Sequence, residues 1–140
     1  MNENKHIKYQ KGFKYQLIAA AQFQLKIQPQ SDIETRFINL SSDGVLTIRS
    51  GYAWDGPSGP TIDTRNFMRG SLIHDALYQL MRLELLPLEF KEPSDKELIR
   101  YCKKDGMSSL RAWWVYKGLH RFGTSATLPE NKKDTLIAPI

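Results

Sequence analysis

The hydrophobic pattern of this 140-residue chain changes once, from a period of two residues to the period of a helix. Between residues 14 and 49, apolar residues such as Phe23, Leu25 and Ile27 alternate with polar ones, which is typical of half-buried strands. From Arg65 onward the apolar residues recur at helical spacing. The pattern predicts an α+β fold, with an N-terminal antiparallel β-sheet built of hairpins followed by three α-helices.

The clearest turn lies between two β-rich runs at residues 37–40 and 45–48. The sequence Ser-Ser-Asp-Gly at residues 41–44 joins them. Asp-Gly between two such runs indicates a β-hairpin. We therefore expect these two runs to pair as antiparallel strands.

The first predicted helix begins near residue 65 and ends before Pro87, because a proline ring cannot continue a helix. This helix is expected to bury one side only. Its apolar residues form one continuous arc of the helical wheel, bordered by His74 and Tyr78. The residues expected to face away from this arc are Asp75, Gln79 and Arg82.

Two further helices are expected after the first. The sequence Ser-Asp-Lys-Glu at residues 94–97 has the form of a capping box, which predicts that the second helix begins there and runs to about Lys104. The third helix is predicted from about residue 108 or 109 to residue 123. Its adjacent Trp113 and Trp114 are expected to divide between the core and the core's rim, and the alternative is that they form a surface for a partner.

The length of 140 residues favours a single domain over residues 1–140, with an extended tail at residues 124–140. Cys102 is the single cysteine, which excludes an internal disulfide and a zinc ribbon and fits a reducing cytosol. Neither a signal sequence nor a membrane span is evident in the sequence. We therefore expect a protein of the cytoplasm.

The chain carries a net charge of +5, which would suit a nucleic-acid binder. Its Lys and Arg residues are scattered, however, and adjacent pairs occur only at residues 103–104 and 132–133. This distribution favours a solvated surface, so nucleic acid is not an expected partner. The sequence also lacks a glycine-rich phosphate loop, a serine elbow and a His-Glu-x-x-His motif, which excludes the corresponding nucleotide-binding and protease classes.

One segment combines residues that could carry out chemistry. His74 and Tyr78 are four residues apart and share a helix face, while Asp75 points about 100° away. If the second helix runs antiparallel to the first, Asp95 lies near His74, where its carboxylate could orient and stabilise an imidazolium ion. The structural alternative for Asp95 is a helix-start acid favoured by the helix dipole.

A loop rich in Gly, Pro and Asp, residues 51–63, precedes this helix. Its Asp55 and Asp63, together with Asp75, offer oxygen ligands for a hard divalent cation such as calcium. The structural alternative is that the two loop acids only make turn hydrogen bonds with their own backbone. Trp54 should be buried as an anchor, because such a loop needs apolar contacts to offset its ordering entropy.

Several separated motifs occur in the order found in a known family. They are the Gly-aromatic-x-Trp-Asp-Gly-x-Ser-x-Pro turn at residues 51–60, His-Asp-x-Leu-Tyr at residues 74–78, Asp95, and an aromatic helix at residues 113–123. Across about residues 35–123 the chain resembles a bacteriophage and prophage family known as domain of unknown function 1353. The resemblance implies a phage-type protein, located in the cytoplasm of the bacterial host or associated with the virion, with a host or phage protein as partner. It implies no activity, because that of the family is not established.

A more local resemblance bears on chemistry. His-Asp-x-x-Tyr on a helix, after a glycine-rich loop and before an Asp on an antiparallel helix, is similar to the core of calcium-dependent phospholipases of the A-two type. The resemblance implies that His74 deprotonates a water, that Asp75 and loop carbonyls near residues 56–59 hold Ca²⁺, that Asp95 orients His74, and that Tyr78 supports Asp95. The disulfides of those enzymes are absent from this chain.

Two functions are therefore expected as alternatives. The first is a small cation-assisted hydrolase; the second is a non-enzymatic phage accessory protein, either a virion or tail component or a binder of a host factor, whose His-Asp cluster is structural. The residues assigned to catalysis are His74, Asp95 and Tyr78, and those assigned to a metal are Asp75, Asp55 and Asp63. An enzyme needs an open path to a His74 nitrogen, whereas a structural cluster is dry and fully hydrogen-bonded.

Overall fold

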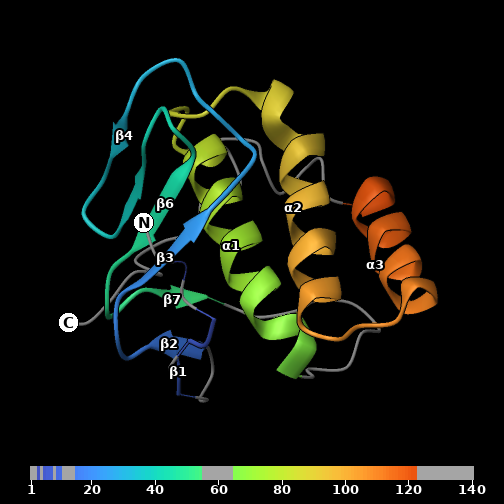
Figure 1. Cartoon of the computed structure of the whole chain (residues 1–140). Helices are drawn as coiled ribbons and strands as arrows, with labels where there is room; N and C mark the ends of the chain where they lie inside the picture. The colour runs from blue at the N-terminus through green and yellow to red at the C-terminus, as the bar shows by residue number, and fades with distance from the viewer. Residues whose placement is uncertain (1–2, 4, 8, 11–14, 55–64, 123–140) are drawn as a thin grey trace. The chain divides into compact units, whose positions relative to one another are not determined.

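The computed structural model describes residues 3, 5–7, 9–10, 15–54 and 65–122. It confirms the α+β prediction, because antiparallel strands precede three helices along the chain (Figure 1). The fold divides into two compact units, with residues 1–55 contributing the strands to the first and residues 56–133 the helices to the second. The predicted tail at residues 124–140 lies outside the described residues, and a single domain over residues 1–140 stays a prediction.

The described part of the first unit contains two antiparallel sheets. One sheet has the order β1-β2-β7, from β1 (Tyr9–Gln10), β2 (Tyr15–Leu17) and β7 (Ala53–Trp54). The other has the order β3-β6-β5-β4, from β3 (Ala21–Gln24), β4 (Ile33–Glu34), β5 (Ile38–Leu40) and β6 (Val45–Ile48).

The predicted hairpin is confirmed as the β5–β6 pair, in which Leu40 lies opposite Leu46. Its turn ends at Gly44, which has a φ angle of +87°. A Cβ atom at Gly44 would lie 2.7 Å from the backbone oxygens of both Leu25 and Ile27. Glycine is therefore required here by backbone conformation and by space.

The core of the first unit follows the predicted alternation. Phe23, Leu25 and Ile27 are buried, and the polar residues between them are exposed. Trp54 is also fully buried, as predicted, and its ring centroid lies 5.5 Å from that of Tyr15 on the neighbouring strand β2. The indole therefore fixes the end of β7 where it pairs with β2.

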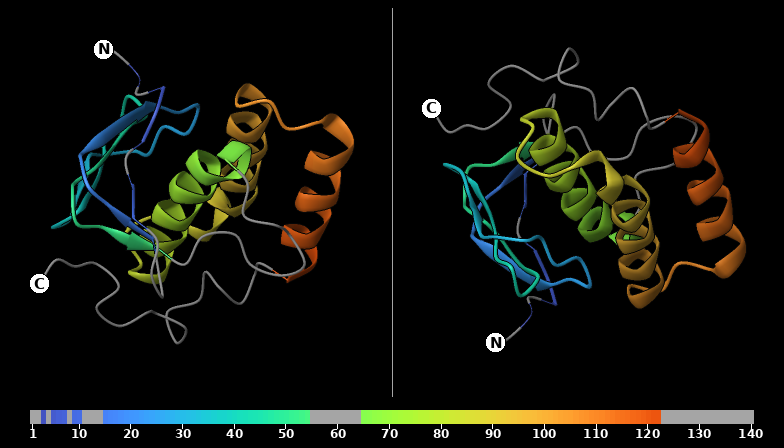
Figure 2. Two further views of the ribbon diagram at one scale, coloured as in Figure 1. Left: turned by 90° about the horizontal axis from the view of Figure 1, so that it is seen from below. Right: turned by 90° about the horizontal axis from the view of Figure 1, so that it is seen from above.

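The described part of the second unit is a set of three helices and one short 3₁₀ segment. These are α1 (Arg65–Arg82), η1 (Leu88–Phe90), α2 (Lys91–Lys104) and α3 (Ser109–Phe122). Helix α2 lies between α1 and α3 in every view (Figures 1 and 2). Tyr78, late in α1, contacts Asp95, early in α2, whereas Arg69, early in α1, pairs with Asp105 just after α2. Helices α1 and α2 are therefore antiparallel, which is the condition for Asp95 to lie near His74.

Helices α1 and α2 approach each other most tightly at Gly70. A Cβ atom at this position would lie 2.9 Å from Cys102 Sγ and from the Leu98 carbonyl oxygen, so glycine allows the close contact. An apolar cluster around this point joins all three helices. It contains Phe67, Leu98, Cys102, Met107, Ala112 and Val115.

The prediction that α1 buries only one side is wrong. Gln79 and Arg82, expected to face away from the core, are only 5% and 3% exposed. The Arg82 guanidinium donates to Gln79 Oε1 at 2.8 Å, so these polar groups are buried together with a partner. Asp75, the third residue expected on that side, is half-buried.

The predicted start of the second helix is also wrong. Helix α2 begins at Lys91, directly after η1, and Ser94 lies inside it, where its hydroxyl donates to the Phe90 carbonyl oxygen at 2.7 Å. Pro93 was expected to precede the helix, but proline is tolerated in a first turn because the N–H groups there have no helical partner. Asp95 is consequently one turn inside the helix and is not a helix-start acid.

Helix α1 ends in a left-handed cap at Glu84, whose φ angle is +61°. The Leu85 N–H donates to the Leu80 carbonyl oxygen and the Glu84 N–H to that of Met81, both at 2.9 Å. This is the Schellman arrangement, in which glycine is the usual residue at the left-handed position. The helix therefore ends before Pro87, as predicted.

Helix α3 begins at Ser109, one of its two predicted starts, and extends to Phe122, but its two tryptophans do not lie as expected. Ala112 and Val115 are its buried residues, whereas Trp113 and Trp114 are 49% and 64% exposed. The prediction that these rings divide between core and rim is therefore wrong. Both rings lie on the outer face of α3, away from Ala112 and Val115.

Candidate functional site

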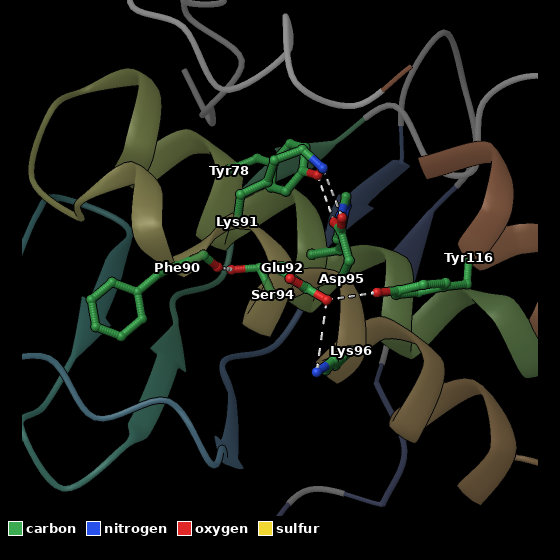
Figure 3. Close-up of polar contacts among 9 residues, drawn as sticks. Tyr78, Phe90, Lys91, Glu92, Ser94, Asp95, Lys96 and Tyr116 are labelled. Atoms are coloured by element: carbon green, nitrogen blue, oxygen red, sulfur yellow. Dashed lines mark hydrogen bonds and ion pairs between the residues drawn. The ribbon is translucent and has the colours of Figure 1, made fainter. Parts of the chain in front are cut away.

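The carboxylate of Asp95 is fully buried and accepts hydrogen bonds from three side chains. Its Oδ1 lies 2.7 Å from His74 Nε2 and 2.6 Å from the Tyr78 hydroxyl, which donates to it. Its Oδ2 accepts from Lys91 Nζ at 3.0 Å. Figure 3 shows Tyr78 and Lys91 pointing to Asp95 from two helices.

Helical spacing places all four side chains. His74 and Tyr78 lie four residues apart on α1, so their rings are neighbours, tilted by 41° with centroids 4.0 Å apart. Lys91 and Asp95 have the same spacing on α2. The antiparallel packing of α1 and α2 brings the His74–Tyr78 pair against the Lys91–Asp95 pair. This confirms the predicted proximity of Asp95 to His74.

The charges at this site are fixed by its hydrogen bonds. Burial alone would raise the pKa of Asp95, but the hydrogen bonds that the carboxylate accepts from His74, Tyr78 and Lys91 hold it below its usual value. Burial and the hydrogen bond to Asp95 raise the pKa of the Tyr78 phenol far above its usual value. At neutral pH, Asp95 is therefore an anion and Tyr78 a neutral donor.

The ionised Asp95 also determines the tautomer of His74. A carboxylate has no proton to give, so the short contact requires that His74 Nε2 carries the hydrogen and donates it. In neutral histidine, Nδ1 then has the free lone pair. His74 Nδ1 has no hydrogen-bond partner among the described residues, and the side chain keeps 11% of its surface exposed.

Lys91 belongs to this site but was not predicted from the sequence. A Lys four residues before an Asp is a recognisable signal for a helical ion pair. The signal was lost because the second helix was predicted to begin at Ser94, which left Lys91 outside it. The ammonium group offsets the buried negative charge of Asp95, since its side chain is only 16% exposed.

A second polar cluster on α2 is separate from the Asp95 site. Glu92 accepts from the Tyr116 hydroxyl at 3.2 Å and lies 3.8 Å from Lys96 Nζ (Figure 3). The side chains of Glu92 and Lys96 are more than half exposed, so this ion pair is solvated. The hydrogen bond from Tyr116 to Glu92 joins α3 to α2, and the Glu92–Lys96 pair offers an exposed control for the buried site.

The described residues do not assemble the predicted cation site. Asp75 is half-buried on α1, and Asp55 and Asp63 lie outside the described residues. Within the described ranges, no group of three His, Cys, Asp or Glu side chains could hold a metal ion. The assignment of Asp75, Asp55 and Asp63 to a metal therefore stays a prediction.

Among the helices of the described segments, none is both long and apolar enough to cross a membrane. Comparison of the chain with models of protein families, with curated proteins and with solved structures found no match. The resemblances noted in the sequence therefore rest on its own motifs.

Proposed function

We propose that this protein is a small hydrolase in which His74 acts as the general base. The observation that carries the proposal is the 2.7 Å contact between His74 Nε2 and the buried Asp95 carboxylate. This contact leaves Nδ1 as the atom that can accept a proton. Asp95 and Tyr78 act as positioning residues, because the carboxylate holds the ring and the phenol holds the carboxylate.

The chemistry follows from this tautomer. Nδ1 takes a proton from a water molecule as the water oxygen bonds to an acyl carbon, and the imidazolium formed is stabilised by Asp95. The same proton then passes from Nδ1 to the leaving alkoxide as the acyl–oxygen bond breaks. General-base catalysis of this type contributes about 10²–10⁴-fold to a rate. The local resemblance to phospholipases of the A-two type makes acyl esters the first substrate class to test.

The steps above use only described side chains, and cation assistance by Asp75, Asp55 and Asp63 is proposed beside them. The predicted calcium dependence is tested separately, by assaying the protein in Ca²⁺ and in EDTA. The phage-type origin, with the host cytoplasm or the virion as location, is proposed from the motif resemblance alone.

The decisive experiment uses His74→Gln on a panel of soluble acyl esters and dispersed phospholipids. The Gln amide nitrogen can still donate to Asp95, but an amide is not a base. We expect at least about a 100-fold loss of activity with the melting temperature nearly unchanged. Tyr78→Phe, which keeps the base, should retain most activity, and Lys96→Ala should retain all of it because Lys96 belongs to the solvated pair. Unchanged activity in His74→Gln would exclude His74 as the base.

A second candidate function is supported by the completeness of the buried network. No buried side-chain nitrogen or oxygen atom of the described residues lacks a hydrogen-bond partner. Lys91 also neutralises Asp95, as expected of a structural ion pair. In this case the protein is a phage accessory component, as a virion or tail part or a binder of a host factor. The wild type should then hydrolyse none of the esters, and His74→Ala should lower stability by roughly 1–3 kcal/mol.

A further inference from the structure

The outer face of helix α3 gathers apolar side chains that the fold leaves exposed. Leu110 is 70% exposed, Trp113 49% and Trp114 64%. Lys117, one turn after Trp113, is exposed as well. We call these four residues the aromatic face. Two neighbouring indoles on a solvated helix are a costly surface unless something covers them.

The aromatic face is one continuous strip. Its residues have the spacing i, i+3, i+4 and i+7, which places them on an arc of about 100°. Ala112 and Val115 point to the opposite side, into the apolar cluster with α2. The two tryptophan rings meet edge to face, with centroids 5.1 Å apart. The strip is therefore a preformed surface and does not contribute to the core.

All the charged residues of the helix that carries the aromatic face, α3, are basic. Residues 109–122 contain Arg111, Lys117 and Arg121 and no Asp or Glu. The Lys117 ammonium lies 5.5 Å from the centre of the Trp113 ring, within the apolar strip itself. The exposed Lys103 and Lys104 come just before the connection to α3. The complementary partner is therefore negatively charged and has an apolar layer.

We propose that the aromatic face binds the surface of an anionic lipid bilayer, with α3 lying in the plane of the interface. Tryptophan favours the boundary between headgroups and acyl chains, and lysine can keep its ammonium among the headgroup phosphates. A protein partner fits less well, because the cores of protein interfaces are depleted in lysine and the Lys117 ammonium lies against the Trp113 ring. The proposal does not rest on the hydrolase function.

The test is flotation of the full chain with vesicles, read together with tryptophan fluorescence. The vesicles are pure phosphatidylcholine or phosphatidylcholine mixed with phosphatidylglycerol. Trp54 is fully buried, so a blue shift on binding reports Trp113 and Trp114. We expect binding to the anionic vesicles with a blue shift, and much weaker binding to the neutral ones.

Variants then assign the binding to the aromatic face. The double variant Trp113→Ser with Trp114→Ser should lose binding, whereas Ile18→Ser, which removes another half-exposed apolar side chain, should not. Lys117→Gln should weaken binding to anionic vesicles about fivefold. His74→Ala should bind as the wild type does, which separates this proposal from the hydrolase.

Two results would overturn the proposal. One is the absence of binding to anionic vesicles, or binding that the tryptophan double variant retains. The other is a wild-type dimer in solution that the double variant converts to monomer while neither protein binds vesicles. The second result would assign the aromatic face to a contact between copies of the chain.

Discussion

Replacing Asp95 with Asn tests whether the buried carboxylate holds the helix pair together. The substitution keeps the size of the side chain but removes its charge. Oδ1 already accepts from His74 and Tyr78, so the new amide nitrogen must face the Lys91 ammonium, and two donors then oppose each other. Breaking a buried ion pair costs about 3–5 kcal/mol. The lower end applies here, because Lys91 and His74 keep 16% and 11% of their side-chain surfaces exposed and water can partly replace the lost partner.

The assay is urea unfolding at neutral pH followed by the helical circular dichroism signal. Asp95→Asn should lower the free energy of unfolding by about 3 kcal/mol. Glu92→Gln is the matched control on the same helix, since it removes the solvated pair with Lys96 and should cost less than about 1 kcal/mol. Equal stability of Asp95→Asn and Glu92→Gln would show that the buried network does not stabilise the pair of helices α1 and α2.

The difference in unfolding free energy between the wild type and Asp95→Asn should also depend on pH. The pKa of Asp95 is lowered in the folded protein, mainly because the hydrogen bonds from its donors outweigh the opposing effect of burial. Its contribution to stability is therefore complete above the unfolded pKa of about 4 and is lost as the pH falls through the lower folded value. The gap between wild type and Asp95→Asn should narrow as the pH falls below about 4. A gap that stays constant in acid would contradict an ionised Asp95.

Three further substitutions test the packing, each by thermal and urea unfolding. Trp54→Ala should cost about 3–5 kcal/mol because the indole is fully buried, and an unchanged melting temperature would exclude its role as an anchor. Glu84→Gly should add up to about 1 kcal/mol because it relieves a positive φ angle, whereas Glu84→Ala, which keeps a Cβ atom, should not. Gly70→Ala should cost roughly 1–3 kcal/mol through its clash with α2, whereas Gly118→Ala, which meets nothing within 4 Å, should be neutral or stabilising.

The elements predicted most accurately are those set by local periodicity. The β5–β6 hairpin follows from alternation and an Asp-Gly turn, and helices α1 and α3 follow from apolar spacing. The meeting of His74 with Asp95 was also predictable, because it needs only one residue spacing and an antiparallel pair of helices. Lys91 was missed because a single error in the start of α2 removed it from the helix.

Burial of polar and aromatic side chains was predicted less well. Gln79 and Arg82 look like surface residues in the sequence, yet they are buried because each satisfies the other. Trp113 and Trp114 look like packing residues, yet they are exposed because Ala112 and Val115 provide the contact between α3 and α2. Local spacing shows which residues share a face, but the packing of other elements decides which faces are covered.

Stability and catalysis make different demands on the Asp95 site, and this difference determines which variants are informative. Asp95 is needed in both proposed functions, because the same carboxylate holds α2 against α1 and orients His74. Loss of activity in an Asp95 variant would therefore not distinguish an enzyme from a scaffold. A structural network needs only the donor at His74 Nε2, whereas a base also needs the lone pair at Nδ1. A substitution that keeps the donor to Asp95 and removes the basic lone pair, as His74→Gln does, is therefore the one that separates the two functions.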